Sequence, residues 1–323
     1  MNLIILIFVI LFHSNYKIGC HSHKQRIIVV GDLHGDYNHL IKILRMTKVI
    51  NHHYQWIGGN YTTLIQTGDV TDRGPDAKKL YNYFINLRSE AKTKGGLFIP
   101  LLGNHEIMNL AENYKYVSEK DISNFGSLNE RKKALSKDGV IGQYLRNLTI
   151  AIKVRDTVFC HGGINLNWST KKVDDLNKKA RHHLLLDNPK QLRKRAIFTQ
   201  KGDGPLWYRG YSKESEDEMC PKLTEVLNRL EAKRMVIGHT IQKKNRITAR
   251  CNNRIILIDV GISSYFRGGH LAALEITDEF TRAIYPNGQF EYFGQLKILD
   301  YHQRQSFRLG SSLFSKNLNS KKT

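Results

Sequence analysis

Gly31-Asp32-Leu33-His34-Gly35-Asp36-Tyr37 follows directly on an apolar, β-branched run at 27–30, which is typical of a buried strand. Asp32 and His34 are two residues apart, so both side chains can reach one point just beyond the end of that strand. The two glycines of the stretch allow the backbone to turn sharply around this point. A carboxylate beside an imidazole suits a divalent metal such as Mn, Zn or Fe. Taken alone, the stretch predicts a strand-end loop, with a metal site and a solvated turn as the two interpretations.

Four further apolar runs of strand length end in short loops of the same kind. These loops read Gly68-Asp69-Val70-Thr71-Asp72-Arg73-Gly74-Pro75, Gly103-Asn104-His105-Glu106, His161-Gly162-Gly163 and Gly238-His239-Thr240. In open α/β sheets, ligands bind where the carboxyl ends of the strands meet. We therefore expect one edge to gather the polar side chains of all five loops. They are Asp32, His34, Asp69, Asn104, His161 and His239.

Six oxygen and nitrogen donors are more than one catalytic metal needs. They suit two ions about 3.5–4 Å apart that share one carboxylate, for which Asp69 is the candidate. Asp32 and His34 would complete the first ion's ligands, and Asn104, His161 and His239 those of the second. A water bridging such ions is acidified towards hydroxide near neutral pH, and it could attack a phosphorus atom in line without a covalent enzyme intermediate.

Other residues of the same loops fit phosphoester cleavage. Arg73 offers a planar fork to phosphate oxygens. His105 is placed to protonate the departing oxygen, with Asp72 orienting its ring. Arg209, which follows the aromatic pair Trp207-Tyr208, offers a second guanidinium. Either arginine alone would be interpreted as a surface charge, and it is the other loops that favour a role in phosphate binding.

The composition is strongly basic, with Lys+Arg 50 against Asp+Glu 29 and a formal net charge of +21 over 323 residues. Such a field attracts anionic partners and does not specify a fold. The segment 165–204 is polar and basic, with a helix predicted over 173–186, and we interpret it as an insert lying over the core. It lacks the interleaved aromatic residues of a nucleic-acid surface, so a nucleic-acid partner is not expected.

The N-terminal segment contains an unbroken apolar run at 3–12, too short to span a bilayer comfortably. Its length is typical of a signal-peptide core, so residues 1–20 are predicted to be a signal peptide or a retained anchor, with a buried strand as the alternative. This predicts the secretory pathway, in the lumen or at the membrane of the endoplasmic reticulum. Residues 301–323 are expected to form a polar, basic tail.

The four cysteines do not have the regular spacing of a disulfide framework. Cys160 ends an apolar run and is expected to be a buried free thiol. A bridge between Cys220 and Cys251 is one alternative, and two further free thiols are the other.

The order of the five loops resembles the phosphoprotein phosphatase family of metallophosphoesterases. The blocks Asp203-Gly-Pro-Leu-Trp-Tyr-Arg209 and Asp259-Val-Gly-Ile-Ser263 resemble its Shewanella-like branch, and the apolar leader is similar to the form found in malaria parasites. The resemblance implies an α/β fold of the calcineurin-like type, a central β-sandwich of mixed sheets flanked by helices, over residues 25–300. It also implies the ligand and catalytic roles above, with Asn104 contacting both metal and substrate.

The leading hypothesis is a phosphoprotein phosphatase that uses two divalent ions, manganese first, with iron or zinc as alternatives. Its substrates would carry phosphoserine, phosphothreonine or phosphotyrosine. A dinucleoside polyphosphate hydrolase on the same site and a non-catalytic binding protein are the rival hypotheses. Around the site, Asp36 is expected either to cap a helix or to contact substrate, and Glu106 to support the metal ligands indirectly. Thr71, which replaces a more usual apolar residue, is expected to be neutral for packing.

Overall fold

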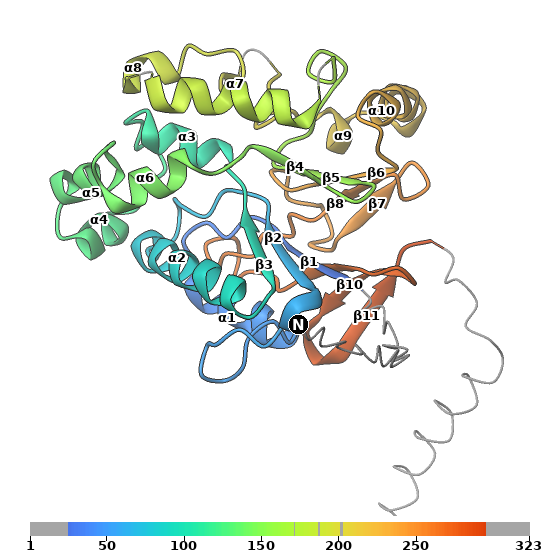
Figure 1. The fold of residues 1–323 in the computed structure, drawn as a ribbon, viewed down its shortest axis with the longest axis horizontal. Coiled ribbons are helices and arrows are strands. Elements are labelled where there is room, and N and C mark those ends of the chain that lie inside the picture. Colours follow the sequence, from blue (N-terminus) through green and yellow to red (C-terminus); the bar gives the residue numbers. More distant parts are fainter. Residues whose placement is uncertain (1–24, 171, 187, 201–202, 295–323) are drawn as a thin grey trace, which may run out of the picture.

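The structure, a computed structural model, describes residues 25–170, 172–186, 188–200 and 203–294 (Figure 1). The predicted leader at 1–20 and the predicted tail at 301–323 lie outside the described residues. Within the described part of the chain, every helix is too short or too polar to cross a bilayer.

Two mixed sheets form the centre of the molecule. The first has the strand order β11-β10-β9-β1-β2-β3, in which β1, β2 and β3 are parallel and the other neighbours are antiparallel. Its strands are β1 (Arg26–Val30), β2 (Thr62–Gln66), β3 (Leu97–Pro100), β9 (Ala273–Ile276), β10 (Thr281–Tyr285) and β11 (Gln289–Tyr292).

The second sheet has the order β4-β5-β6-β8-β7, with β5, β6 and β8 parallel. Its strands are β4 (Ala151–Val154), β5 (Thr157–Cys160), β6 (Arg234–Ile237), β7 (Thr248–Arg250) and β8 (Ile255–Leu257). The two sheets lie one above the other, and their buried residues, Val29 and Phe159 among them, belong to one hydrophobic core (Figure 1). The predicted sandwich of mixed sheets with flanking helices is confirmed.

Helices cover the outer side of each sheet. The first sheet carries α1 (Tyr37–Met46) and α2 (Ala77–Thr93), whose apolar faces are buried. Beside it lie α3 (Asn104–Leu110), α4 (Glu119–Phe125), α5 (Leu128–Leu135) and α6 (Val140–Arg146). Over the second sheet lie α7 (Val173–Leu186), α9 (Gly210–Lys213) and α10 (Glu216–Arg229), while α8 (Pro189–Leu192) lies beside α3 (Figure 1). The helix predicted over 173–186 is confirmed as α7, and the predicted cap of α1 is confirmed because Asp36 accepts the N–H of His39.

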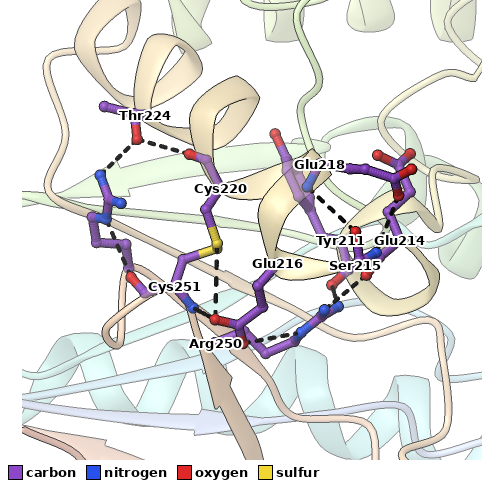
Figure 2. Close-up of a disulfide and its surroundings, with 10 residues drawn as sticks. Tyr211, Glu214, Ser215, Glu216, Glu218, Cys220, Thr224, Arg250 and Cys251 are labelled. Carbon is purple, nitrogen blue, oxygen red and sulfur yellow. Dashed lines mark hydrogen bonds and ion pairs between the residues drawn. A yellow bond between two sulfur atoms is a disulfide. The ribbon is translucent and has the colours of Figure 1, made fainter.

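The elements absent from the sequence-based prediction include β7, β11, α8, α9 and α10. Helix α10 did carry a signal, since Ser215 and Glu218 form a capping box at its start. It bears Cys220, which forms a disulfide with Cys251 just after β7 (Figure 2). Of the alternatives left open for these two cysteines, the bridge is therefore confirmed, and Cys160 is confirmed as a buried free thiol.

Candidate metal centre

The centre lies where loops from the two sheets meet. Within each sheet, the strands β1 and β2, or β5 and β6, are parallel, so their carboxyl ends lie at one edge. The loops at these two edges are in contact. Side chains of each sheet's loops hydrogen-bond to the main chain of the other's. Both carboxylate oxygens of Asp32 accept the N–H of His239, each at 3.1 Å, and the Nδ1 of His161 lies 2.9 Å from the carbonyl oxygen of Thr67. The two sheets thus fix the relative positions of the polar side chains between them.

Close backbone approach and strain mark these loops. A Cβ atom on Gly103 would lie 2.1 Å from Oδ1 of Asp69, so only glycine fits there. Several non-glycine residues have positive φ, which costs about 1–3 kcal/mol each and clusters at functional sites. They are His34 (41°), Asp69 (57°), Asp72 (71°), Arg73 (71°) and His239 (68°).

Asp69 lies at the middle of the predicted ligands. Its Oδ2 atom is 3.2 Å from Nε2 of His161 and 3.7 Å from Nε2 of His34. The same oxygen is 3.8 Å from Nε2 of His105, which was predicted as an acid and not as a ligand. Asp69 therefore belongs to two groups of donors at once, as a carboxylate shared between two ions would.

The remaining predicted ligands surround His161. Its Nε2 atom lies 2.9 Å from Oδ1 of Asn104 and 3.0 Å from Nδ1 of His239. Its Nδ1 atom lies 3.9 Å from Oδ1 of Asp32. The structure brings all six predicted ligand residues together, and all six are buried.

These donors fit divalent metal ions. The Nδ1 atoms of His34 and His161 face the carbonyl oxygens of Thr71 and Thr67, which leaves each Nε2 lone pair turned towards Asp69. The Nε2 atom of His239 is buried and has no hydrogen-bond partner among the described residues. Neutral imidazole nitrogens beside carboxylate and amide oxygens form a donor set suited to Mn, Fe or Zn.

The electrostatics of the centre favour bound cations. Burial and the neighbouring charges of Asp259 and Asp69 raise the pKa of Asp32 well above its ordinary value. Burial raises the pKa of Asp259 to about 6 and lowers that of His34 to about 4. Burial and the adjacent His161 also lower the pKa of His239. Imidazoles that stay neutral next to crowded carboxylates are prepared to bind a metal.

Asp259 is a buried acidic residue of the centre that the sequence-based site list left out. It follows β8, a strand parallel to β6 in the second sheet, and its charge acts on Asp32. Its Oδ1 atom accepts the N–H of Gly261 at 2.9 Å. Asp259 could have been found by the pattern that predicted the other site residues, a polar residue directly after an apolar run.

Asp72 and His105 form the predicted pair. The Nδ1 of His105 lies 2.5 Å from Oδ2 of Asp72, and the other oxygen of Asp72 accepts the side-chain N–H of Asn109 at 2.9 Å. Burial acts to lower the pKa of His105, but the carboxylates of Asp69 and Asp72 outweigh it and raise that pKa. His105 can therefore hold a proton on the ring that faces the centre.

The two predicted arginines approach the centre in different ways. The guanidinium carbon of Arg73 lies 4.2 Å from the ring centroid of Tyr116 and 5.5 Å from that of Tyr265, and its buried Nε has no hydrogen-bond partner among the described residues. Arg209 is held instead by polar contacts. Its Nη1 donates to the carbonyl oxygen of His239 and to Oγ1 of Thr240, both at 2.8 Å.

Arg209 is the residue that caps α9, and the disulfide region fixes that helix. The guanidinium of Arg250 donates to the carbonyl oxygens of Tyr211 and Glu214, each at 2.7 Å (Figure 2). Cys251, the next residue, is bridged to α10. The position of Arg209 thus depends on contacts that reach back to the second sheet.

Glu106 supports the centre from behind, as expected. Its carboxylate is fully buried. Among the described residues, its hydrogen-bond donors belong to the loops that carry the predicted ligands and to one tyrosine. The donors are the backbone N–H groups of Gly103 (2.7 Å), Asp69 (2.8 Å), Val70 (2.9 Å) and Thr71 (3.3 Å) and the hydroxyl of Tyr81 (3.0 Å).

The expectation that Thr71 is neutral for packing is wrong. Its Oγ1 accepts a hydrogen bond of 3.2 Å from Arg131, a fully buried arginine of α5. The same guanidinium donates to Oδ2 of Asp121 at 2.9 Å and to Oδ1 of Asn109 at 2.7 Å. An apolar residue in place of Thr71 would leave one arginine N–H group without its acceptor. Arg131 was missed because it lies 60 residues from Thr71 in a polar helix.

Comparison with known proteins identifies the architecture. Residues 25–243 match the calcineurin-like phosphoesterase family. The chain belongs to this family. It is 36% identical over 269 residues to Shewanella-like protein phosphatase 1 of Plasmodium berghei, covering 80% of this chain and 74% of that protein. It is 28% identical over 298 residues to Shewanella-like protein phosphatase 2 of Arabidopsis thaliana, covering 78% and 75% of the two chains.

A solved structure agrees with this assignment. The crystal structure of a cold-active protein-tyrosine phosphatase from a psychrophilic Shewanella superposes with a TM-score of 0.75 at 28% identity, covering 83% of this chain and 80% of that one. The predicted resemblance to the Shewanella-like protein phosphatases is confirmed. The chain is a metal-dependent protein phosphatase, a phosphoric monoester hydrolase of a family with a dinuclear metal centre.

Proposed function

We propose that this phosphatase hydrolyses phosphoserine, phosphothreonine or phosphotyrosine in phosphoproteins, with two divalent ions held around Asp69. The observation that carries the proposal is the position of Asp69, whose one oxygen lies within 4 Å of three histidine nitrogens on separate loops. We assign Asp32, His34 and Asp69 to the first ion, and Asp69, Asn104, His161 and His239 to the second.

The chain's own residues would then divide the work of hydrolysis. Arg73 and Arg209 bind the non-bridging phosphate oxygens, and the amide of Asn104 orients the phosphate beside its metal. His105 donates its proton to the departing alcohol oxygen, while Asp72 holds the ring and stabilises the protonated form. The ions, when bound, polarise the phosphoryl group and make a water nucleophilic near neutral pH.

The phosphorylated residue of the substrate and the identity of the metal are supported by different observations. Tyr116 and Tyr265 beside Arg73, and the likeness to a protein-tyrosine phosphatase, support phosphotyrosine among the substrates. Manganese is proposed as the working metal from the mixed nitrogen and oxygen donors.

We also propose that the protein works in the secretory pathway, in the lumen or at the membrane of the endoplasmic reticulum. The apolar run at 3–12 and the Cys220–Cys251 bridge, a bond favoured in oxidising compartments, support this. Fractionation with protease protection of a C-terminally tagged chain tests it, and full digestion in intact microsomes would contradict it.

The central test is Asp69→Asn, assayed on phosphopeptides carrying each of the three phosphorylated residues with added manganese. We expect kcat/KM to fall by at least about 100-fold, because a shared ligand contributes more than the 10–100-fold typical of residues behind the ligands. Asp36→Asn is the matched control, since Asp36 is a buried carboxylate that is not a predicted ligand. Asparagine keeps the oxygen that caps His39 and loses the acceptor of the Ser264 N–H group, so this variant should cost stability and keep kcat/KM.

Unchanged activity in Asp69→Asn would overturn the proposed centre, and so would purified active protein without bound metal. A diadenosine polyphosphate tested beside the peptides addresses the rival hydrolase. Faster turnover of that substrate than of every phosphopeptide would overturn the assignment to phosphoproteins.

A further inference from the structure

A hollow of about 370 Å³ opens beside the centre, on the side of Asn104 and Arg209. These two residues also contact the predicted ligands His161 and His239, so the hollow and the centre share a wall. Its other walls come from Lys115 and its neighbours after α3, and from the basic insert at Arg193. A substrate whose phosphate lies at the metals would extend into this space.

The walls of the hollow are positively charged. Lys115, Arg193 and Arg209 line it, and its lining residues include neither aspartate nor glutamate. Among the residues that the structure describes, neither Lys115 nor Arg193 forms an ion pair, although Lys115 lies 5.2 Å from the ring centroid of Tyr116. Arg209 is assigned above to the reacting phosphate. Among the described residues, these two cations of the hollow therefore have no anionic partner, and the hollow lies directly beside the centre.

The insert is fixed where it contributes its arginine. Arg193 follows α8 directly, and the preceding Leu192 is buried in the hydrophobic core. Further along, the indole Nε1 of Trp207 donates to the carbonyl oxygen of Phe198 at 3.1 Å, and both residues line the hollow. Arg193 is thus an exposed residue that lines the hollow from an anchored segment.

We propose that this hollow binds a second anionic group of the substrate, a carboxylate or a further phosphate near the phosphorylated residue, with Arg193 and Lys115 as the residues that select it. The proposal rests on the proposed function, because it needs a phosphopeptide with its phosphate at the centre. The enzyme would then prefer acidic or multiply phosphorylated segments of phosphoproteins. Carboxylate and phosphate oxygens share the chemistry that arginine and lysine recognise.

The test compares phosphopeptides that differ only in charge. In the first series, each peptide carries one glutamate, placed at one of the three positions before or the three positions after the phosphorylated residue. The second series carries glutamine at the same positions, and the third carries a second phosphoserine there. Each exposed ion pair is worth about 1.5- to 5-fold in binding. At the best position, we expect kcat/KM to be about 3- to 20-fold higher with glutamate than with glutamine, mainly through KM. The doubly phosphorylated peptide, with its larger charge, should exceed both.

Variants then identify the residues. Arg193→Gln with Lys115→Gln should bring the glutamate-to-glutamine ratio to within about twofold of unity and leave kcat on the glutamine peptides unchanged. Lys190→Gln is the matched control, because Lys190 is an exposed cation of α8 that does not line the hollow. It removes one charge from the same helix and should preserve the preference. Raising the salt concentration should weaken the preference in the wild type, as screening of exposed charges requires.

Two outcomes would overturn the proposal. The wild type could show no charge preference at any position, or Lys190→Gln could reduce the preference as much as the double variant Arg193→Gln with Lys115→Gln, which would indicate a general field effect. A small aryl phosphate without a second anion, hydrolysed equally by all variants, shows that the centre is intact. Failure to hydrolyse that substrate and every phosphopeptide would instead contradict the proposed function.

Discussion

Glu106 joins the loops that carry Asp69 and Asn104, and we predict that Glu106→Gln loosens this junction. The Oε2 atom of Glu106 accepts the N–H groups of Asp69 and Gly103, while Oε1 accepts the hydroxyl of Tyr81 and two further N–H groups. Glutamine has one oxygen, so its better orientation keeps the contacts of Oε1. Its NH₂ group must then face the N–H groups of Asp69 and Gly103.

The expected magnitude follows from those two donors. Each buried donor left without an acceptor costs about 1–3 kcal/mol, so Glu106→Gln should lower the free energy of unfolding by about 2–6 kcal/mol. One of the donors is the backbone of Asp69, so metal affinity should fall as well, by about 10–100-fold. Urea denaturation of the metal-free protein measures the first effect, and calorimetric titration with manganese measures the second.

Tyr81→Phe is the matched control for this prediction. It removes one hydroxyl donor to Glu106, costing about 1 kcal/mol, and leaves every backbone N–H group paired. Metal affinity should therefore stay at the wild-type value. If Glu106→Gln unfolds within about 1 kcal/mol of the wild type and binds manganese as tightly, the supporting role assigned to Glu106 is wrong.

Three further predictions concern buried charge and the covalent bridge. Burial raises the pKa of Asp259 from 3.8 to about 6, so between these values the metal-free folded protein holds a proton that the unfolded chain releases. The contribution of Asp259 to stability should fall by about 3 kcal/mol as the pH rises through this window, while His34, whose pKa burial lowers to about 4, acts in the opposite sense. The difference between melts of the wild type and of Asp259→Asn in chelator isolates the Asp259 contribution. Arg131→Met leaves the buried carboxylate of Asp121 unpaired and should cost about 3–5 kcal/mol in urea unfolding, part of which Asp121→Asn in the same chain should restore. Cys220→Ser opens a bridge of sequence separation 31 to Cys251 and should cost about 3–4 kcal/mol, an effect that reductant should reproduce in the wild type and not add to in the variant.

The ligand residues could be predicted from the sequence because each one lies in a short loop that follows a strand. Asp32 comes two residues after β1 ends, and His161 immediately follows β5. The carboxyl ends of parallel strands lie at one edge of the sheet, so polar loops that follow such strands in the sequence lie close together in space. The same rule applied once more, to the end of β8, would have included Asp259.

The groups behind the ligands could not be found in this way. Arg131 reaches Thr71 and Asp121 from a helix whose sequence is polar, and a buried arginine in such a helix looks like a solvated one until its partners are known. The partners are set by how α4 and α5 pack beside the first sheet. Short or irregular elements such as β7 were missed for a related reason, since three half-buried residues carry too little periodicity to be recognised.

The balance of charge explains why the centre and the hollow beside it have opposite character. The centre buries the carboxylates of Asp32, Asp69 and Asp259 beside histidines. Burial lowers the pKa values of His34 and His239, so these imidazoles stay uncharged and do not balance the negative charge of the carboxylates. Such a site is costly without cations and becomes favourable when divalent ions supply the missing charge. Once they do, the site attracts phosphate, and the cations around it lie where the remaining negative charge of a phosphopeptide would extend. The acidic interior and the basic rim are thus two parts of one binding site for an anionic substrate.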